Sequence, residues 1–331
     1  MRLIDTVSGA PAVAMLGMCK NAGKTTAMNT LIRDFPDKGV LCVTSIGIDG
    51  ESRDLVTGTA KPSIWIREGM LSATAEGLLP LCDVSREILY ASGIYTSLGE
   101  VIIFRAHSDG YVQLAGPGII DQLGALRIIL AEFGTDCVLI DGALNRKSLQ
   151  AGAADGACIL SAGASLDRDM DKVVAETAYA AELLCLPEYV GKKESGRSSG
   201  QIRVLYGDDR EAFFDDPANI PDLSGPEIIF FPGALTESHG RALLRSKAIR
   251  AGVTAIVKDS SCLLLKRETW KALADRGVCF AVQNPANLAA VTVNPFAPEG
   301  WRFDPDAFLD KMREAVPVPV FDVLSCGEDC G

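Results

Sequence analysis

The stretch Gly17-Met-Cys-Lys-Asn-Ala-Gly23-Lys24-Thr25-Thr26 decides how this chain is interpreted. It follows the apolar run 13–16, which reads as a strand, and it precedes a helical pattern that begins at Thr25. Glycines let a backbone turn tightly enough for successive amides to point at one anion, and a helix start adds partial positive charge. The stretch therefore predicts a phosphate-binding loop between a strand and a helix.

Each residue type in the loop suits that chemistry. Lys24 is expected to neutralise the β- and γ-phosphates of ATP, and the Thr25 hydroxyl to bind Mg²⁺. The nucleotide-binding set is predicted to be Gly17, Asn21, Ala22, Gly23, Lys24, Thr25 and Thr26. Five residues separate Gly17 from Gly23, where the common P-loop has four. This longer spacing resembles the loop of dethiobiotin synthetase and related P-loop NTPases.

Two carboxylates further along the chain are candidates for the same site. Four apolar residues, 137–140, end in Asp141-Gly142, which has the form of a Walker B strand and predicts Asp141 as a Mg²⁺ ligand. Asp49, on the turn after the predicted strand 39–46, is a second candidate catalytic or metal-coordinating residue, with Glu51 and Asp54 as alternatives. Ligands bind at such strand ends in open α/β sheets.

The wider pattern of the chain predicts an α/β fold. Continuous apolar strands alternate with helices, which favours a mainly parallel P-loop NTPase sheet with helices on both faces. We expect this domain to cover residues 1–190 and a linker or mobile loop to cover 191–200. Residues 201–331 are expected to form a second α/β domain or to extend the sheet. The runs 101–104 and 111–114 flank Ser108-Asp109-Gly110 and predict a hairpin.

Composition narrows the classes of partner. The net charge of −11 argues against wrapping of nucleic acid, and no run of apolar residues is long enough to span a membrane. The N-terminus does not have the form of a signal peptide, so a cytoplasmic location is expected. Only two histidines occur, which excludes a multi-histidine metal site. The ten cysteines are scattered and are expected to be reduced.

Several segments together resemble a known family. These are 17–26, 44–51, 59–62, 140–148 and 159–164, with fainter likeness at 293–295 and 319–323. They are similar to the P-loop subunit of the reactivase for the cobalamin-dependent lysine aminomutase. The resemblance implies an ATPase that releases inactivated cobalamin from the mutase and works with a second reactivase subunit. Relatives of this loop type often dimerise, so a homo-oligomer is a further expectation.

Other functions remain open on the sequence alone. The loop spacing also fits an ATP-dependent small-molecule synthetase of the dethiobiotin type, although the second half of the chain is larger than such an enzyme needs. A nucleotide-binding scaffold with little turnover is a third hypothesis. ATP is preferred over GTP, because Val257-Lys-Asp-Ser260 lacks the asparagine and the spacing of a guanine-binding element.

Overall fold

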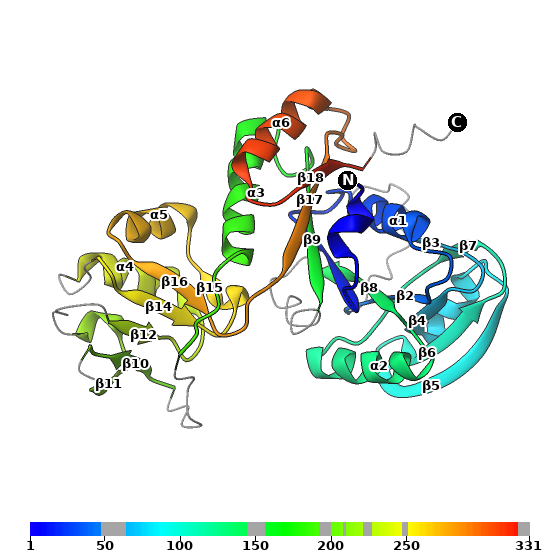
Figure 1. The fold of residues 1–331 in the computed structure, drawn as a ribbon, viewed down its shortest axis with the longest axis horizontal. Coiled ribbons are helices and arrows are strands. Elements are labelled where there is room, and N and C mark those ends of the chain that lie inside the picture. The colour runs from blue at the N-terminus through cyan, green and yellow to red at the C-terminus, as the bar shows by residue number, and fades with distance from the viewer. Residues whose placement is uncertain are drawn as a thin grey trace. The chain divides into compact units, whose positions relative to one another are not determined.

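The computed structural model describes residues 1–47, 64–143, 156–191, 200–207, 210–220, 227–246 and 251–323 (Figure 1). The chain divides into two compact units. The first consists of Met1–Ala181 and Asn287–Gly331, and the second of Glu182–Ala286. These boundaries, after Ala181 and after Ala286, differ from the predicted division at 191–200. The second unit is an insertion, and the residues after it return to the first unit.

The first unit is built on a nine-stranded sheet with the order β18-β17-β9-β1-β8-β2-β4-β6-β5. The pairs from β18 to β4 are parallel, and β4, β6 and β5 pair antiparallel. The mixed α/β class with a mostly parallel sheet, expected from the sequence, is confirmed. The nine strands are β1 (Ala12–Gly17), β2 (Leu41–Ser45), β4 (Leu71–Ala75), β5 (Arg86–Thr96), β6 (Gly99–Ala106), β8 (Cys137–Ala143), β9 (Ala157–Gly163), β17 (Leu288–Asn294) and β18 (Val320–Asp322).

Helices cover both faces of this sheet, and the alternation of side chains along the strands explains why. In β1, Val13 and Met15 join the core cluster of α1 (Lys24–Asp34), whereas Ala12 joins that of α2 (Ile120–Glu132). Successive side chains of a strand point to opposite faces, so a continuously apolar strand needs cover on both sides.

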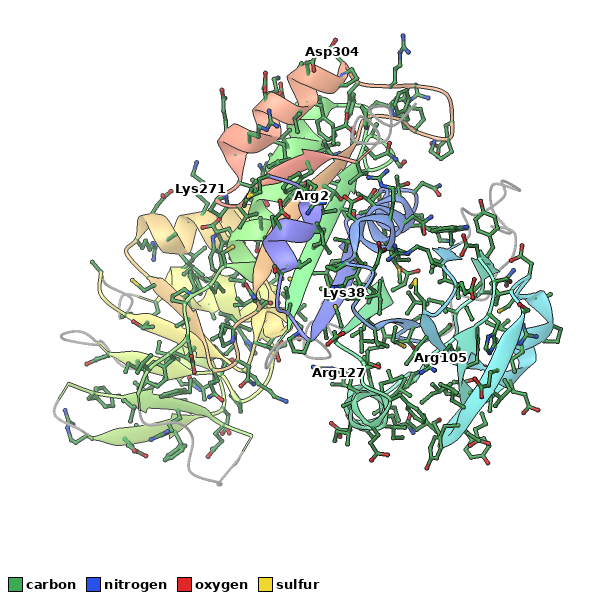
Figure 2. The ribbon with its side chains drawn as sticks, turned by 45° about the vertical axis from the view of Figure 1, so that its right-hand side comes forward. Arg2, Lys38, Arg105, Arg127, Lys271 and Asp304 are labelled. Carbon is green, nitrogen blue, oxygen red and sulfur yellow. The ribbon has the colours of Figure 1, made fainter. Side chains whose placement is uncertain are left out.

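Two further helices complete the first unit. These are α3 (Met170–Leu184), whose last residues belong to the second unit, and α6 (Pro305–Ala315). Figure 2 marks Asp304 at the start of α6, where its carboxylate accepts a hydrogen bond from the Ala307 amide at 2.9 Å. An N-cap aspartate followed by proline is a typical helix start. Short 3₁₀ helices occur at Leu3–Val7 and Glu76–Leu81.

The predicted hairpin of 101–104 with 111–114 is wrong. β6 instead forms a hairpin with β5, which precedes it, and the turn between them ends at Gly99 with a φ of 102°. β7 (Gly110–Val112) pairs antiparallel with β3 (Ile64–Ile66) in a separate two-stranded sheet. The bend at 108–110 therefore separates two sheets rather than joining two paired strands.

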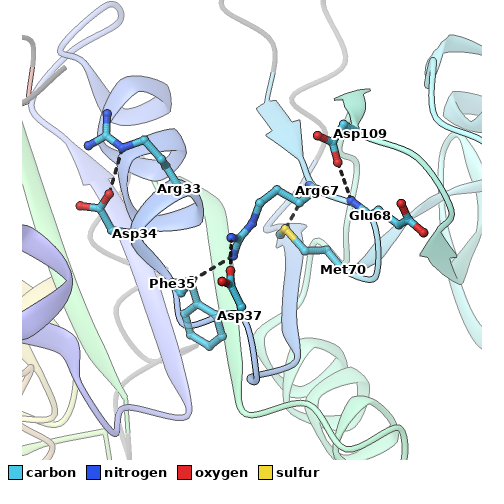
Figure 3. Close-up of polar contacts among 8 residues, drawn as sticks. All are labelled: Arg33, Asp34, Phe35, Asp37, Arg67, Glu68, Met70 and Asp109. Carbon is cyan, nitrogen blue, oxygen red and sulfur yellow. Dashed lines mark hydrogen bonds and ion pairs between the residues drawn. The ribbon is translucent and has the colours of Figure 1, made fainter. Parts of the chain in front are cut away.

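A partly exposed ion pair links the segment after α1 to the turn that follows β3. Arg67 binds the Asp37 carboxylate at 2.9 Å and donates from its second terminal nitrogen to the Phe35 carbonyl at 3.0 Å (Figure 3). In the same turn, Asp109 accepts the Glu68 amide at 2.8 Å. These contacts fix the connection at the end of α1 that is opposite to Lys24.

The second unit has its own five-stranded sheet, with the order β11-β10-β12-β14-β16. The strands β12, β14 and β16 are parallel, and β10 and β11 pair antiparallel at one edge. Its elements are β10 (Ile202–Leu205), β11 (Glu211–Phe214), β12 (Ile228–Phe230), α4 (Glu237–Arg245), β14 (Thr254–Val257), α5 (Arg267–Asp275) and β16 (Cys279–Val282), with β13 (Leu235–Thr236), β15 (Leu263–Leu264) and 3₁₀ turns at Pro217–Asn219 and Ser260–Cys262.

A membrane span is not found in the part of the chain that the structure describes, because none of its helices combines the necessary length and apolar character.

Candidate functional site

The glycine loop, residues 18–23, connects β1 to α1 at the carboxyl end of the sheet. Two of its residues have left-handed backbones, Asn21 with a φ of 59° and Gly23 with a φ of 96°. Glycine adopts this conformation without strain, and asparagine tolerates it better than most residues. The loop begins where the Met18 amide donates to the Ser161 carbonyl at 2.9 Å, so β9 anchors its first residue.

Lys24 is the first residue of α1, and its side chain folds back over the end of β1. A Cβ atom added at Gly17 would lie 2.9 Å from Lys24 Cδ and 3.0 Å from Cγ. A side chain at that position would force the lysine stem to move. The reason for a glycine at position 17 is therefore steric, because Gly17 faces the Lys24 side chain.

Asp141 lies beside Lys24 because β8 is the immediate neighbour of β1 in the sheet. Lys24 Nζ is 3.5 Å from Asp141 Oδ1, and the two side chains are 14% and 5% exposed. The Asp141 carbonyl also accepts the Ile46 amide at 2.7 Å, which holds β8 to the end of β2. A nearly buried carboxylate next to a lysine offers oxygen ligands of the kind that Mg²⁺ prefers.

The start of α1 differs from the starts of the other helices in its charge. The first N–H groups of a helix have no partner within the helix and carry partial positive charge. α1 has no acidic residue in its first turn and no side-chain cap, and its N-cap is Gly23. The first turns of the other α-helices that the structure describes each contain an acid, namely Asp121, Asp171, Glu237, Glu268 and Asp306.

β9 and β17 lie against the loop on the side away from β8 and Asp141, so the loop has one wall on each side. Asn294, the last residue of β17, donates from Nδ2 to the Asn21 carbonyl at 3.0 Å. Ser165 donates to the same carbonyl at 3.4 Å. A Cβ atom on Gly163 would lie 3.2 Å from Ala22 Cα, and one on Gly23 would lie 3.2 Å from Asn294 Cβ.

The remaining predicted residues are distributed as follows. Ala22 is buried at the base of the loop, and Thr25 and Thr26 are the second and third residues of α1. The Thr26 carbonyl accepts the Thr30 hydroxyl at 3.0 Å. Asp49, its alternatives Glu51 and Asp54, and residues 145–148 lie outside the described residues, as does most of the predicted linker 191–200.

Cys19 is the nucleophilic side chain nearest the start of the loop. Burial raises the pKa of its thiol to about 11, and the charge of Glu299 adds to this effect. The raised pKa keeps the thiol mostly protonated at neutral pH, which makes it a weak nucleophile.

Sequence reasoning did not assign a role to Asn294, Gly163 or Ser165. Asn294 directly follows residues 290–293, which the apolar pattern predicts to be a strand, and it lies at the type of strand end where α/β proteins bind ligands. That position was a usable signal, but the pairing of β17 with β9 was needed to bring it to the loop.

Within the described residues, no group of three or more His, Cys, Asp or Glu side chains is arranged to hold a metal. A metal at this site would therefore need ligands from elsewhere, such as the Thr25 hydroxyl and phosphate oxygens. Mg²⁺ fits that requirement, because it is commonly bound by one or two protein groups together with substrate phosphates and water.

The fold and site define a mixed α/β protein with a mostly parallel sheet and a glycine-bearing loop at its carboxyl edge. Comparisons with protein-family models, curated proteins and solved structures found no significant match to the chain.

Proposed function

We propose that the chain is a P-loop ATPase that binds ATP with Mg²⁺ and hydrolyses it. The observation that carries the proposal is the 3.5 Å contact between Lys24 at the start of α1 and the nearly buried Asp141 of the adjacent strand. The sequence motif alone predicts a loop. The contact brings the predicted phosphate-binding lysine and the predicted metal ligand to the same point.

The chain's own groups suggest how the phosphates would be held. The free N–H groups at the start of α1 would donate to phosphate oxygens, and Lys24 would neutralise part of their charge. Its folded stem over Gly17 limits the positions that Nζ can reach. Thr25 and Asp141 would hold Mg²⁺, which would supply charge neutralisation between the terminal phosphates.

The Lys24–Asp141 pair also has an electrostatic role before the nucleotide arrives. A nearly buried lysine or carboxylate left alone is costly, because neither charge is solvated. Each side chain serves as the counterion of the other. We infer that nucleotide binding exchanges these partners, so that Lys24 turns to phosphate and Asp141 to the metal.

The biological role that we propose rests on the resemblance described from the sequence. ATP hydrolysis would drive the release of inactivated cobalamin from an aminomutase, with a second reactivase subunit as partner. For hydrolysis to drive that release, the ATP and ADP forms must bind the mutase with different affinities. Mutase-stimulated turnover is the observation that would support this role.

The test of the ATPase proposal is phosphate release by the purified full chain with ATP or GTP over a Mg²⁺ titration. Asp141→Asn keeps the size of the side chain and removes its charge. We expect the Mg²⁺ concentration for half-maximal turnover to rise about tenfold or more. Asp136→Asn is the matched control, because Asp136 precedes the same strand and accepts the Val40 amide at 2.7 Å.

The outcomes separate the alternatives. A Mg²⁺ response of Asp141→Asn equal to that of the wild type would remove Asp141 from the site. Turnover that appears only when a small-molecule acceptor is added would favour a synthetase. Tight ATP binding without turnover, with or without an aminomutase, would favour a nucleotide-binding scaffold.

A further inference from the structure

The Asn21 carbonyl of the glycine loop accepts hydrogen bonds from side chains outside the loop. Asn21 has a left-handed backbone, and its neighbours Ala22 and Gly23 lead directly into α1. A peptide plane that carries an externally fixed carbonyl cannot rotate freely. Because the same peptide plane carries the Ala22 N–H, fixing the Asn21 carbonyl also fixes the direction of that donor.

Asn294 makes this contact with a side chain that is itself held in place. Its Nδ2 donates to the Asn21 carbonyl at 3.0 Å, while its Oδ1 accepts the Phe296 amide at 3.1 Å. The second bond fixes which end of the amide faces the loop. Its Cβ also stands 3.2 Å from the position that a Cβ on Gly23 would occupy, so the backbone of the loop packs closely against it.

The end of β9 packs against both the loop and Asn294. Gly163 leaves just enough room for Ala22, since a Cβ there would lie 3.2 Å from Ala22 Cα and 3.2 Å from the Asn294 carbonyl. The Ala164 amide donates to that Asn294 carbonyl at 2.9 Å. The loop is thus supported by two strands on one side and by the strand of Asp141 on the other.

We propose that Asn294 is a positioning residue for nucleotide binding, which acts by holding the Asn21 peptide so that the loop amides face the phosphates. This inference rests on the proposed function. It assigns a role to the segment that follows the second unit. Asn294 is not a catalytic residue in this view, because both ends of its side-chain amide are engaged by the protein's own backbone.

The test compares two substitutions of Asn294 that remove the donor in different ways. Asn294→Leu removes it without adding charge. Asn294→Asp replaces it with a carboxylate that faces the Asn21 carbonyl, but a protonated carboxyl can donate again. For Mg-ADP binding measured by calorimetry at pH 8, we expect each variant to bind about tenfold more weakly than wild type. The Asp variant should regain affinity, relative to wild type, only as the pH falls through the ordinary carboxyl value of about 3.9, and the Leu variant should not regain it.

Asn287→Asp is the matched control. Asn287 precedes the same strand at its opposite end, and its Nδ2 donates to the Gly156 carbonyl at 3.3 Å. Losing that bond should lower the melting temperature without changing Mg-ADP affinity. Equal loss of affinity in Asn287→Asp and Asn294→Asp would show a general structural effect and overturn the proposal. Wild-type affinity in Asn294→Leu would overturn it as well, since any effect of Asp would then be charge alone.

A second measurement decides the inference independently of nucleotide binding. Hydrogen exchange of residues 18–26 in the ligand-free chain should speed up in Asn294→Leu and remain unchanged in Asn287→Asp. Gly163→Ala should speed it up too, because the added methyl group would press on Ala22. Absence of Mg-ADP binding by the wild type would refute the proposed function, whereas unchanged loop exchange in Asn294→Leu would refute the role of Asn294.

Discussion

Each unit contains a strand that leads to a helix, but α1 of the first unit and α4 of the second differ at their starts in charge and in capping. In the first unit, β1 leads through a glycine loop to α1, which begins with Lys24 and has no side-chain cap. In the second unit, β12 leads to α4, where the Thr236 hydroxyl accepts the His239 amide and Glu237 occupies the first turn. An anion is attracted to the first helix start and repelled by the second. Parallel sheet topology supplies the position of a site, and a few residues at the strand end decide whether it can hold phosphate.

The largest effect that would test this difference is the loss of the lysine. If the proposed site is right, Lys24→Ala should lower ATP turnover at least about 100-fold, because the charge proposed to lie nearest the phosphates is removed. Lys266→Ala is the matched control, since Lys266 is the N-cap of α5 in the second unit. Phosphate release measures both. Undiminished ATP turnover in Lys24→Ala, or an equal loss of turnover in Lys266→Ala, would contradict the assignment of the site to the first unit.

The next effect is steric. Gly17→Ala should reduce ATP turnover about tenfold, because the new methyl group would displace the Lys24 stem that lies 2.9 Å away. Gly233→Ala gives the comparison in the second unit, in the loop after β12. A Cβ there has no described atom within 4 Å, so activity and stability should stay as in the wild type. Equal behaviour of the two variants would mean that the close approach at Gly17 has no functional consequence.

The second unit offers the converse experiment, in which stability changes and turnover does not. Glu237 accepts the Lys266 amide at 2.9 Å and the Thr269 hydroxyl at 2.7 Å, and so joins the start of α4 to α5. Glu237→Gln should destabilise the second unit by about 1–2 kcal/mol and speed hydrogen exchange in α4. Glu268→Gln, in the first turn of α5, is the control. A loss of ATP turnover at neutral pH in Glu237→Gln would contradict the separation of roles.

The same carboxylate predicts a pH dependence. The hydrogen bond from the Lys266 amide, followed by those from Thr269 and Arg241, lowers the pKa of Glu237 in the folded state. Its stabilising contribution is therefore complete at neutral pH. It is lost as the pH falls below the ordinary value of about 4.3 and through the lowered pKa. The protection factors of the α4 amides, which correct for the intrinsic pH dependence of exchange, should fall over that interval in the wild type, and less steeply in Glu237→Gln.

The smallest effect is expected at the far end of α1. Arg67→Ala removes the contacts to Asp37 and to the Phe35 carbonyl, and should cost about 0.5–1 kcal/mol because much of this site is exposed. Arg33→Ala, whose side chain pairs with the neighbouring Asp34, should cost less. Thermal unfolding compares them. A drop in ATP affinity in Arg67→Ala would show that this end of the helix also governs the loop.

The parts of the fold that the sequence predicts well are those set by local pattern. The strand–loop–helix unit around Lys24 and the strand that carries Asp141 depend on short-range periodicity and on glycine. Both are present, although β8 continues past Asp141 to Ala143. The hairpin assignment failed because the bend at 108–110 is a strong local signal, whereas β5 is irregular and half exposed. Its register with β6 shifts twice, which disturbs the alternation that marks a strand.

The limits of the second unit and the role of Asn294 depend on pairing that no local pattern records. The pattern predicts a strand at 290–293, but it does not say which sheet the strand enters. β17 joins β9, across more than one hundred intervening residues. Asn294 gained a candidate role only through that pairing.

The bond between Asn21 and Asn294 joins residues 273 positions apart, and this separation has a consequence for how the chain is made. A ribosome releases the loop early and its supporting strand only after the whole inserted unit has been synthesised. At about 5–20 residues per second, the delay is on the order of tens of seconds. During that interval the nascent loop lacks one of its two walls. Truncated products that end before β17 would contain the complete nucleotide motif without the strand that positions it.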